Sequence, residues 1–252
     1  MPSHFHLLSV STLLLAAVPL VPAIAQTSSA PSQQEPARQL QVLLDAAYPA
    51  DGPGAAVMVS RGGRTIFAGG RGMADIAARR KITVDTPFYL GSITKTFTAT
   101  LILKLVEEGK LSLDDPIAKH VPGFPEPAAR ATIRHLLNHS SGIADYSKLP
   151  GFIAQNRDKQ FSSAALLEVM KCLAPVAAPG EKWEYNNGGY VLLGIIAENV
   201  TRQTWPEALR SRITAPLKLR SVMPPSSGPR RAAGCRSTPG WSRSRTRRRG
   251  ST

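Results

Sequence analysis

Cysteine and aromatic residues are scarce in this chain. Its 252 residues include two cysteines, and Phe, Trp and Tyr together make up 6%. Two cysteines exclude a small domain held by several disulfides. Cys172 and Cys235 could pair in an oxidising compartment, but the predicted apolar helix face around Cys172 favours a buried free thiol. The fold must therefore be stabilised mainly by an ordinary apolar core.

Acidic residues are also few, and their shortage is greatest at the C-terminal end. The chain has 31 Lys and Arg against 17 Asp and Glu, a formal charge of +14. Residues 226–252 contain eight Arg but no Asp, Glu or Lys. Without those eight Arg, 23 basic residues remain against 17 acidic ones, a charge of +6. The body of the chain is only mildly basic, which is weak support for an acidic partner.

Two interpretations of residues 226–252 remain open. The Arg residues with Trp241 could form a basic arm that binds nucleic acid or anionic membrane. The composition also fits a disordered or out-of-frame tail, because it has no aliphatic residue larger than Ala with which to bury a core. We favour the second interpretation and predict no nucleic-acid partner.

Long apolar runs are absent except near the N-terminus. Residues 7–20 are apolar and precede Ala23-Ile24-Ala25, a small-x-small cleavage signature. We therefore expect residues 1–25 to be a signal peptide and the protein to be secreted or periplasmic. An uncleaved membrane anchor is the alternative, but the run is short for a span of about 20 residues. After signal removal we expect a flexible linker over 26–36 and no membrane span.

Patterns that bind metals or phosphate groups are weak. His135 and His139 have a metal-ligand spacing, yet the helix lacks the Glu of a zinc protease and no third ligand is evident. We interpret both histidines as structural. The glycines at 52–54 and 61–64 are typical of turns, not of a phosphate-binding loop. No metal or other cofactor is predicted.

Ser92 and Lys95 are the first candidate catalytic pair. They lie three residues apart where turn and strand signals give way to apolar residues at helical spacing, which stop at Gly109. Side chains at that spacing on a helix are about 5–6 Å apart, so the lysine amine can reach the serine hydroxyl and accept its proton. The positive end of the helix dipole also favours a developing oxyanion. Ser-x-x-Lys alone is common by chance, and an exposed helix cap is the plain alternative.

A second element raises the odds of a catalytic site. Tyr185 and Asn187 follow a turn at Pro179-Gly180 and precede the apolar run 191–197. Residues two apart on a loop before a helix can both face one cleft. Asn and Gly also favour ordinary turns, so this element too is weak by itself.

Together the two elements resemble those of the serine β-lactamase and penicillin-binding-protein superfamily. The Tyr-x-Asn form is similar to its branch of class C β-lactamases, D-alanyl-D-alanine carboxypeptidases and related esterases. Family-like phrases at 86–95, 105–116 and 133–143 extend the resemblance over about residues 40–219. The resemblance implies the roles of four residues: Ser92 as acylated nucleophile, Lys95 as its proton partner, Tyr185 as general acid/base, and Asn187 as a substrate-amide contact.

The resemblance also implies an α+β fold, β-lactamase/transpeptidase-like, in which an antiparallel sheet is flanked by helices and a helical lobe. The family completes its site with a Lys- or His-(Thr/Ser)-Gly strand, and no such triplet follows Asn187. We therefore expect a partial domain over 37–225, truncated or frameshifted, with C-terminal strands missing and activity impaired. The patterns predict a hairpin of 55–60 with 64–68, and helices over 36–47, from Ser92 onward, and over 132–138, 163–173, 189–201 and 206–213.

The predicted function is that of an exported serine hydrolase. Its substrate would be a small molecule or a peptidoglycan peptide, with a β-lactam, a D-Ala-D-Ala peptide and a small ester left open. A non-catalytic remnant or binding module on the same fold is the alternative. The sequence does not predict an oligomeric state.

Overall fold

The structure, a computed structural model, describes residues 34–156, 159 and 161–222. The chain divides into two compact units, Met1–Thr86 and Pro87–Thr252. The predicted signal peptide, residues 26–33 of the predicted linker and the Arg-rich tail lie outside the described residues. Each unit is described by itself.

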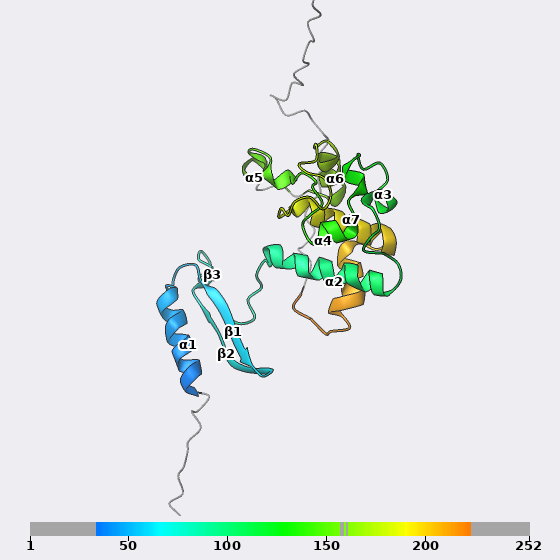
Figure 1. Cartoon of the computed structure of the whole chain (residues 1–252). Helices are drawn as coiled ribbons and strands as arrows, with labels where there is room; N and C mark the ends of the chain where they lie inside the picture. Colours follow the sequence, from blue (N-terminus) through cyan, green and yellow to red (C-terminus); the bar gives the residue numbers. More distant parts are fainter. Residues whose placement is uncertain (1–33, 157–158, 160, 223–252) are drawn as a thin grey trace, which may run out of the picture. The chain divides into compact units, whose positions relative to one another are not determined.

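The first unit is a helix beside a β-hairpin (Figure 1). Helix α1 (Gln34–Ala47) packs on β2 (Arg64–Arg71), which pairs antiparallel with β1 (Ala55–Arg61). The turn between the strands has positive φ at Gly62 (56°) and Gly63 (76°), as a tight hairpin turn requires. The predicted hairpin is confirmed, and β2 runs three residues further than expected.

A second, shorter hairpin follows in the same unit. It joins β3 (Met73–Asp75) to β4 (Arg80–Lys81), again antiparallel. Strands of three and two residues are too short to show an alternating apolar pattern, so neither strand was predicted from the sequence.

The second unit contains the remaining helices. Residues 91–93, 128–130 and 146–148 form single 3₁₀ turns. The α-helices are α2 (Thr94–Glu107), α3 (Ile117–His120), α4 (Ile133–Leu137), α5 (Phe152–Gln155), α6 (Ser163–Lys171), α7 (Asn187–Thr201) and α8 (Trp205–Leu209). A π-helical turn, Arg210–Thr214, continues α8.

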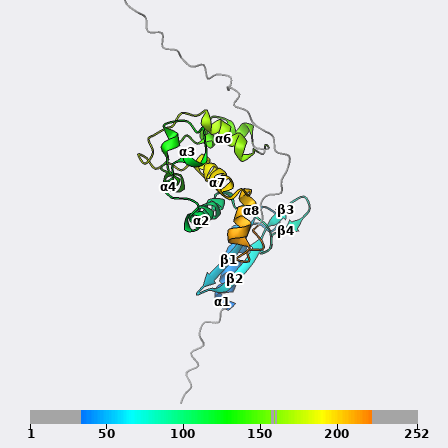
Figure 2. The ribbon, with the colours of Figure 1, turned by 90° about the vertical axis from the view of Figure 1, so that its right-hand side faces the viewer.

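Helix α7 is the centre of this unit's core. It packs against α2, α4, α6 and α8 (Figures 1 and 2). Leu192, Leu193 and Ile196 are completely buried, as are Leu101 and Leu105 on α2. A helix surrounded on several sides needs apolar residues around most of its circumference, which explains the long apolar run after residue 190.

The predicted helices are confirmed within a few residues at their ends. The prediction over 206–213 covers most of α8 and most of the π-helical turn. Helices α3 and α5 were not predicted, because each has only four residues and so cannot display a helical period. Within the described part of the chain, no helix is long and apolar enough to span a bilayer.

The expectation for Cys172 is wrong. Helix α6 ends at Lys171, so Cys172 is the C-cap and lies beyond the apolar stripe of the helix. Its side chain is exposed, and it is disulfide-bonded. Cys235 lies outside the described residues.

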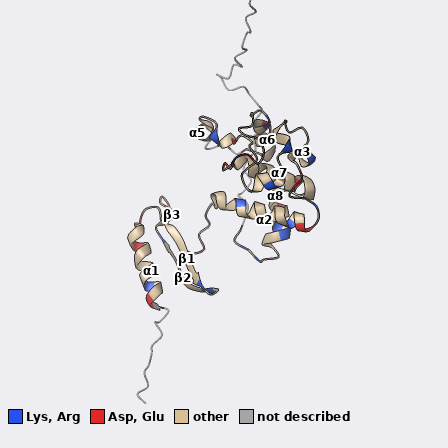
Figure 3. Cartoon of the chain, in the orientation of Figure 1, with Lys and Arg blue, Asp and Glu red and all other residues tan. Residues whose placement is uncertain are grey.

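Charges of both signs are interspersed along the described helices and strands (Figure 3). Among the acidic side chains that form ion pairs in the described residues, that of Asp115 is the most buried. It accepts from Lys119 Nζ at 2.7 Å, from His120 Nε2 at 2.9 Å and from the backbone N–H of Ser112 at 3.0 Å. Burial opposes its ionisation, but these hydrogen bonds outweigh burial and lower the pKa of Asp115 to about 2.

Candidate active site

Ser92 lies where the chain enters α2. It is the middle residue of the 3₁₀ turn Gly91–Ile93, and Gly91 reaches a φ of 53° that favours glycine. Lys95 lies in the first turn of α2. Ser92 is exposed and Lys95 is half-buried. The serine hydroxyl is thus accessible to a substrate beside the positive end of a helix.

Tyr185 and Asn187 lie on either side of the N-cap of α7. The cap residue, Asn186, has extended backbone angles (φ −140°, ψ 118°), and its side chain accepts a hydrogen bond from Gly189 N at 2.9 Å. Residues on either side of an extended residue project toward the same side. The capping geometry therefore directs Tyr185 and Asn187 together toward α2.

The structure brings the four predicted residues together. Tyr185 Oη donates to Ser92 Oγ at 2.8 Å, and Lys95 Nζ donates to Asn187 Oδ1 at 2.8 Å. Lys95 Nζ also lies 4.7 Å from the centroid of the Tyr185 ring and 5.5 Å from that of Tyr190. Within the described residues Ser92 Oγ is hydrogen-bonded to Tyr185 and not to Lys95, whose amine is held by Asn187.

The Tyr185 hydroxyl has an altered acidity. The largest effect is the interaction with Lys95, which lowers the pKa of Tyr185. The hydrogen bond with Ser92 lowers this pKa further. Burial and the negative charge of Asp145 act in the opposite direction but are outweighed. A phenol whose pKa is lowered by a neighbouring cation exchanges protons more readily near neutral pH, which suits an acid/base group.

His139 is a site residue that the sequence analysis treated only as structural. Its ring lies 4.7 Å from the Tyr185 ring and 5.2 Å from the Tyr190 ring. Its Nδ1 accepts from the backbone N–H of Asn186 at 3.2 Å. Burial lowers the pKa of His139, and the charge of Lys95 lowers it further. The neutral imidazole of His139 thus packs against the Tyr185 ring and helps to hold it in place.

His135, its partner in the histidine pair, makes a different contact. It forms a capping box with Thr132 at the start of α4, where each residue's side chain accepts from the other's backbone N–H. No group of three or more His, Cys, Asp or Glu suited to a metal ion occurs among the described residues.

Two loops are joined beside the site, residues 139–143 and 176–186. Gly142 has a φ of 68°, and a Cβ atom there would lie 2.1 Å from the carbonyl oxygen of Ala177, so only glycine fits. The bonds that join the loops are Val176 N to Gly142 O (2.8 Å), Gly180 N to Ser140 O (2.8 Å), Glu184 N to His139 O (2.8 Å) and Asn186 Nδ2 to Ile143 O (2.7 Å). These bonds hold the segment that carries Tyr185 against the end of α4.

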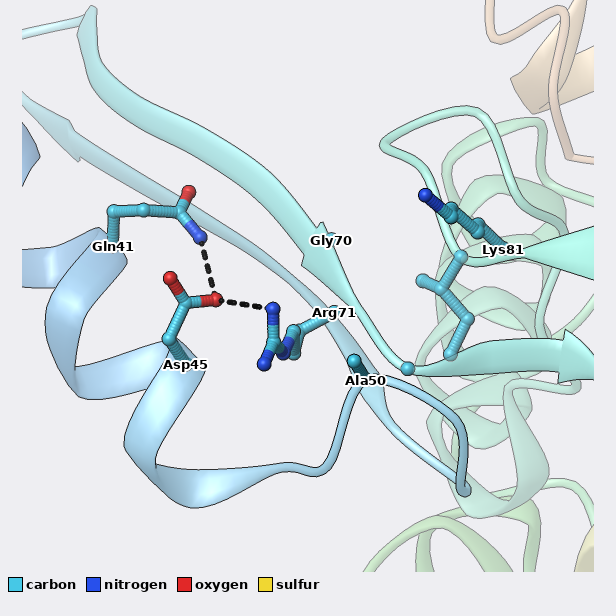
Figure 4. Close-up of a pocket in the computed structure, with 8 residues that line it drawn as sticks. Gln41, Asp45, Ala50, Gly70, Arg71 and Lys81 are labelled. Atoms are coloured by element: carbon cyan, nitrogen blue, oxygen red, sulfur yellow. Dashed lines mark hydrogen bonds and ion pairs between the residues drawn. The ribbon is translucent and has the colours of Figure 1, made fainter.

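A hollow of about 270 Å³ in the first unit is lined by side chains of a different kind from those at Ser92 (Figure 4). Asp45 pairs there with Arg71 at 3.2 Å and accepts from Gln41 at 3.1 Å. The residues that line this hollow include no Ser, Thr, Cys or His, so it lacks a hydroxyl or thiol nucleophile and the imidazole that often serves as its base. The Ser92 site is therefore the better candidate.

The comparison with protein families agrees with this arrangement. A family model described as "Beta-lactamase" matches residues 44–251. The chain belongs to the beta-lactamase family. The match extends beyond residue 219, where the resemblance of the sequence phrases ends. The fold is accordingly the β-lactamase/transpeptidase-like α+β fold that the sequence analysis predicted.

Several known proteins are similar to the chain. Penicillin-binding protein 4* of Bacillus subtilis (strain 168) is 33% identical over 164 residues, which cover 64% of this chain and 35% of that protein. The octameric penicillin-binding protein homologue from Pyrococcus abyssi is 36% identical with a TM-score of 0.61, over 73% of this chain and 43% of that one. D-amino acid amidase from Ochrobactrum anthropi SV3 is 33% identical with a TM-score of 0.61, over 72% and 49%. The chain spans about a third of the length of the curated relatives it matches.

Proposed function

We propose that this protein is an exported serine hydrolase that works through an acyl-enzyme on Ser92, with activity impaired because no Lys- or His-(Thr/Ser)-Gly triplet follows Asn187. The observation that carries the proposal is the 2.8 Å hydrogen bond between Tyr185 Oη and Ser92 Oγ, with the Lys95 amine beside the same phenol ring. A hydroxyl nucleophile hydrogen-bonded to a group that a third residue polarises is the general arrangement for nucleophilic catalysis.

The proposed reaction has two steps. In the reactive state Tyr185 is a phenolate stabilised by the Lys95 ammonium. Ser92 Oγ attacks the carbonyl carbon of an amide or ester, and its proton passes to Tyr185 Oη. Tyr185 returns a proton to the leaving amine or alcohol as the scissile bond breaks, which leaves the acyl group on Ser92. Water then attacks the carbonyl carbon of the acyl-enzyme and gives up a proton to Tyr185. As the bond between Ser92 Oγ and the acyl group breaks, Tyr185 passes a proton to Ser92 Oγ. The N-terminus of α2 stabilises the oxyanion in both steps.

The proposed substrates are small amides and esters, among them β-lactams and D-Ala-D-Ala peptides. The support is the Tyr-x-Asn element at residues 185–187 and the similarity to a penicillin-binding protein and a D-amino acid amidase. Export is proposed from the apolar run and cleavage signature within residues 1–25. The protein would then be secreted or periplasmic.

A non-catalytic binding module is the second candidate. The observation in its favour is that no Lys- or His-(Thr/Ser)-Gly triplet follows Asn187 in this sequence. Such a module would hold a substrate-like ligand without forming a covalent bond to it.

Covalent labelling separates the two candidates. The full chain is incubated with a fluorescent fluorophosphonate and with a fluorescent penicillin, and the adduct is located by peptide mass mapping. We expect an adduct on Ser92 that is lost in Ser92→Ala and retained in the control Ser60→Ala, which changes an exposed serine of β1. Reversible binding of penicillin without an adduct would support the binding module and contradict the hydrolase.

A further inference from the structure

Asp145 is a buried carboxylate next to the site that the proposed reaction does not use. Its exposed fraction is 7%, and it caps the 3₁₀ turn Tyr146–Lys148. Oδ1 accepts from Ser147 N at 3.0 Å and from Ser147 Oγ at 2.9 Å. Oδ2 accepts from Asn187 N at 2.9 Å and from Asn187 Nδ2 at 3.3 Å. Four donors converge on two oxygens, so an ionised carboxylate, which only accepts, fits this place better than an amide.

The contacts of Asp145 determine which way the Asn187 side chain points. Asn187 Nδ2 donates to Ser147 Oγ at 2.9 Å as well as to Asp145 Oδ2. Both N–H groups of the amide thus point at acceptors on one side, and Oδ1 must point to the other. On that other side lies Lys95 Nζ, 2.8 Å away. A reversed amide would set its N–H groups against the ammonium and its oxygen against the carboxylate, which is unfavourable at both ends.

We infer that Asp145 is a positioning residue, which fixes the Asn187 amide so that its oxygen holds the Lys95 amine beside Tyr185 and Ser92. The inference rests on the proposed function, because it assigns a role in the same site. Asp145 itself contacts neither Ser92 nor Lys95 through a hydrogen bond, so its effect on the position of the Lys95 amine passes through Asn187.

Asp145 also acts on the site through its charge. The titratable groups nearest the Tyr185 phenol are Lys95 on α2, His139 on the preceding loop, Asp145, and Tyr190 on α7. The negative charge of Asp145 raises the pKa of Tyr185, against the stronger lowering by Lys95 and Ser92. Removing that charge while keeping the shape should lower the pKa of Tyr185 further.

The first test is a double-mutant cycle on the rate of covalent labelling by fluorophosphonate. We expect Asp145→Asn to lower that rate by about tenfold or more, because misplacing a catalytic group by about 1 Å can cost on the order of a hundredfold. In an Asn187→Ala background the same substitution should cause little further loss, since the link it acts through is gone. Equal losses in both backgrounds would overturn the inference.

The second readout is the pH profile of labelling. The limb of the profile that Tyr185 governs should move to lower pH in Asp145→Asn. Asp115→Asn is the matched control, because Asp115 is also 7% exposed and hydrogen-bonded but contacts no site residue. It should destabilise the fold and leave the profile in place. An unmoved profile in Asp145→Asn would count against the inference.

A third readout separates failure of the inference from failure of the proposed function. If the unmodified chain is not labelled at all, the hydrolase proposal fails. The side-chain amide of Asn187 can still be followed by ¹⁵N–¹H NMR, where Asp145→Asn should shift its two proton signals and speed their exchange with water. Ser147→Ala, a milder change, should shift the same signals less. Signals that both variants leave unchanged would overturn the inference.

Discussion

The two compact units differ sharply in how much apolar surface they bury. Among the described residues of the first unit, the buried hydrophobic ones are Leu44, Phe67 and Ile82, each still 6–8% exposed. In the second unit α7 and its neighbours supply every one of the largest fully buried side chains of the described chain. Deep burial contributes most of a domain's stability. The four residues of the candidate site all belong to the better-packed unit, which suits groups that must be held to within a fraction of an ångström.

The largest expected effect is on the chemistry of the second unit. Lys95→Ala should lower the rate of Ser92 labelling by about 10²–10⁴, the usual range when an acid/base group is removed. The matching change in the first unit, Lys81→Ala on β4, should leave the rate unchanged, because Lys81 is an exposed strand residue. Rates are measured by gel fluorescence at several probe concentrations. Full activity in Lys95→Ala would remove the lysine from the mechanism.

The next effect is on stability and tests the packing difference directly. Leu192→Ala in α7 should lower the free energy of unfolding by about 3–5 kcal/mol, because a fully enclosed site leaves a cavity. Leu44→Ala in α1 should cost less than half as much, since its surroundings can relax toward solvent. Urea titrations followed by circular dichroism measure both values. Equal costs would show that the first unit is packed as tightly as the second.

A smaller effect concerns acid stability in the second unit. The folded-state pKa of Asp115 is about 2, below its ordinary value of 3.8. The stabilisation is therefore complete above about pH 4 and is lost as the pH falls toward 2. Its size is on the order of 2 kcal/mol. Asp115→Asn should flatten the fall in melting temperature over that window, and a variant that falls as steeply as the parent would contradict this.

The smallest effect is at a helix end. Ser162 caps α6, its Oγ accepting from Ala165 N at 3.1 Å. Ser162→Ala should lower the free energy of unfolding by about 1 kcal/mol, whereas Ser162→Asp should preserve it because Asp also accepts at this position. Thermal unfolding of the three proteins is compared. A loss of similar size in Ser162→Asp would show that the cap is not the cause.

The sequence predicted those parts of the fold that are regular over many residues. The hairpin around Gly62-Gly63 and the long helices α2 and α7 were found because turn glycines and apolar periodicity are local signals. Helix α3 was not found because its four residues are stabilised by tertiary contacts such as the burial of Ile117. Such contacts leave no periodic trace in the sequence.

The same limit applies to the candidate site. Ser92, Lys95, Tyr185 and Asn187 belong to two short local patterns, so the sequence could suggest them. His139 and Asp145 act through partners 47 and 42 residues further along the chain. No spacing rule links positions so far apart. His139 in particular invited comparison with a metal ligand because its nearest histidine is local, whereas its actual partners are not.

The hydrogen bonds between residues 139–143 and 176–186 determine which positions of these two loops can accept other side chains. The loop that delivers Tyr185 is held largely by main-chain atoms, and residue identity is constrained at Gly142, which has no room for a Cβ atom, and at His139 and Asn186, whose side chains also bond across the loops. Most side chains along both loops are thus free to change while the backbone path stays fixed. An exposed residue such as Val176, which is 57% exposed and joins the loops through its main-chain N–H, can be exchanged without removing these bonds or displacing the nucleophile and its proton partners.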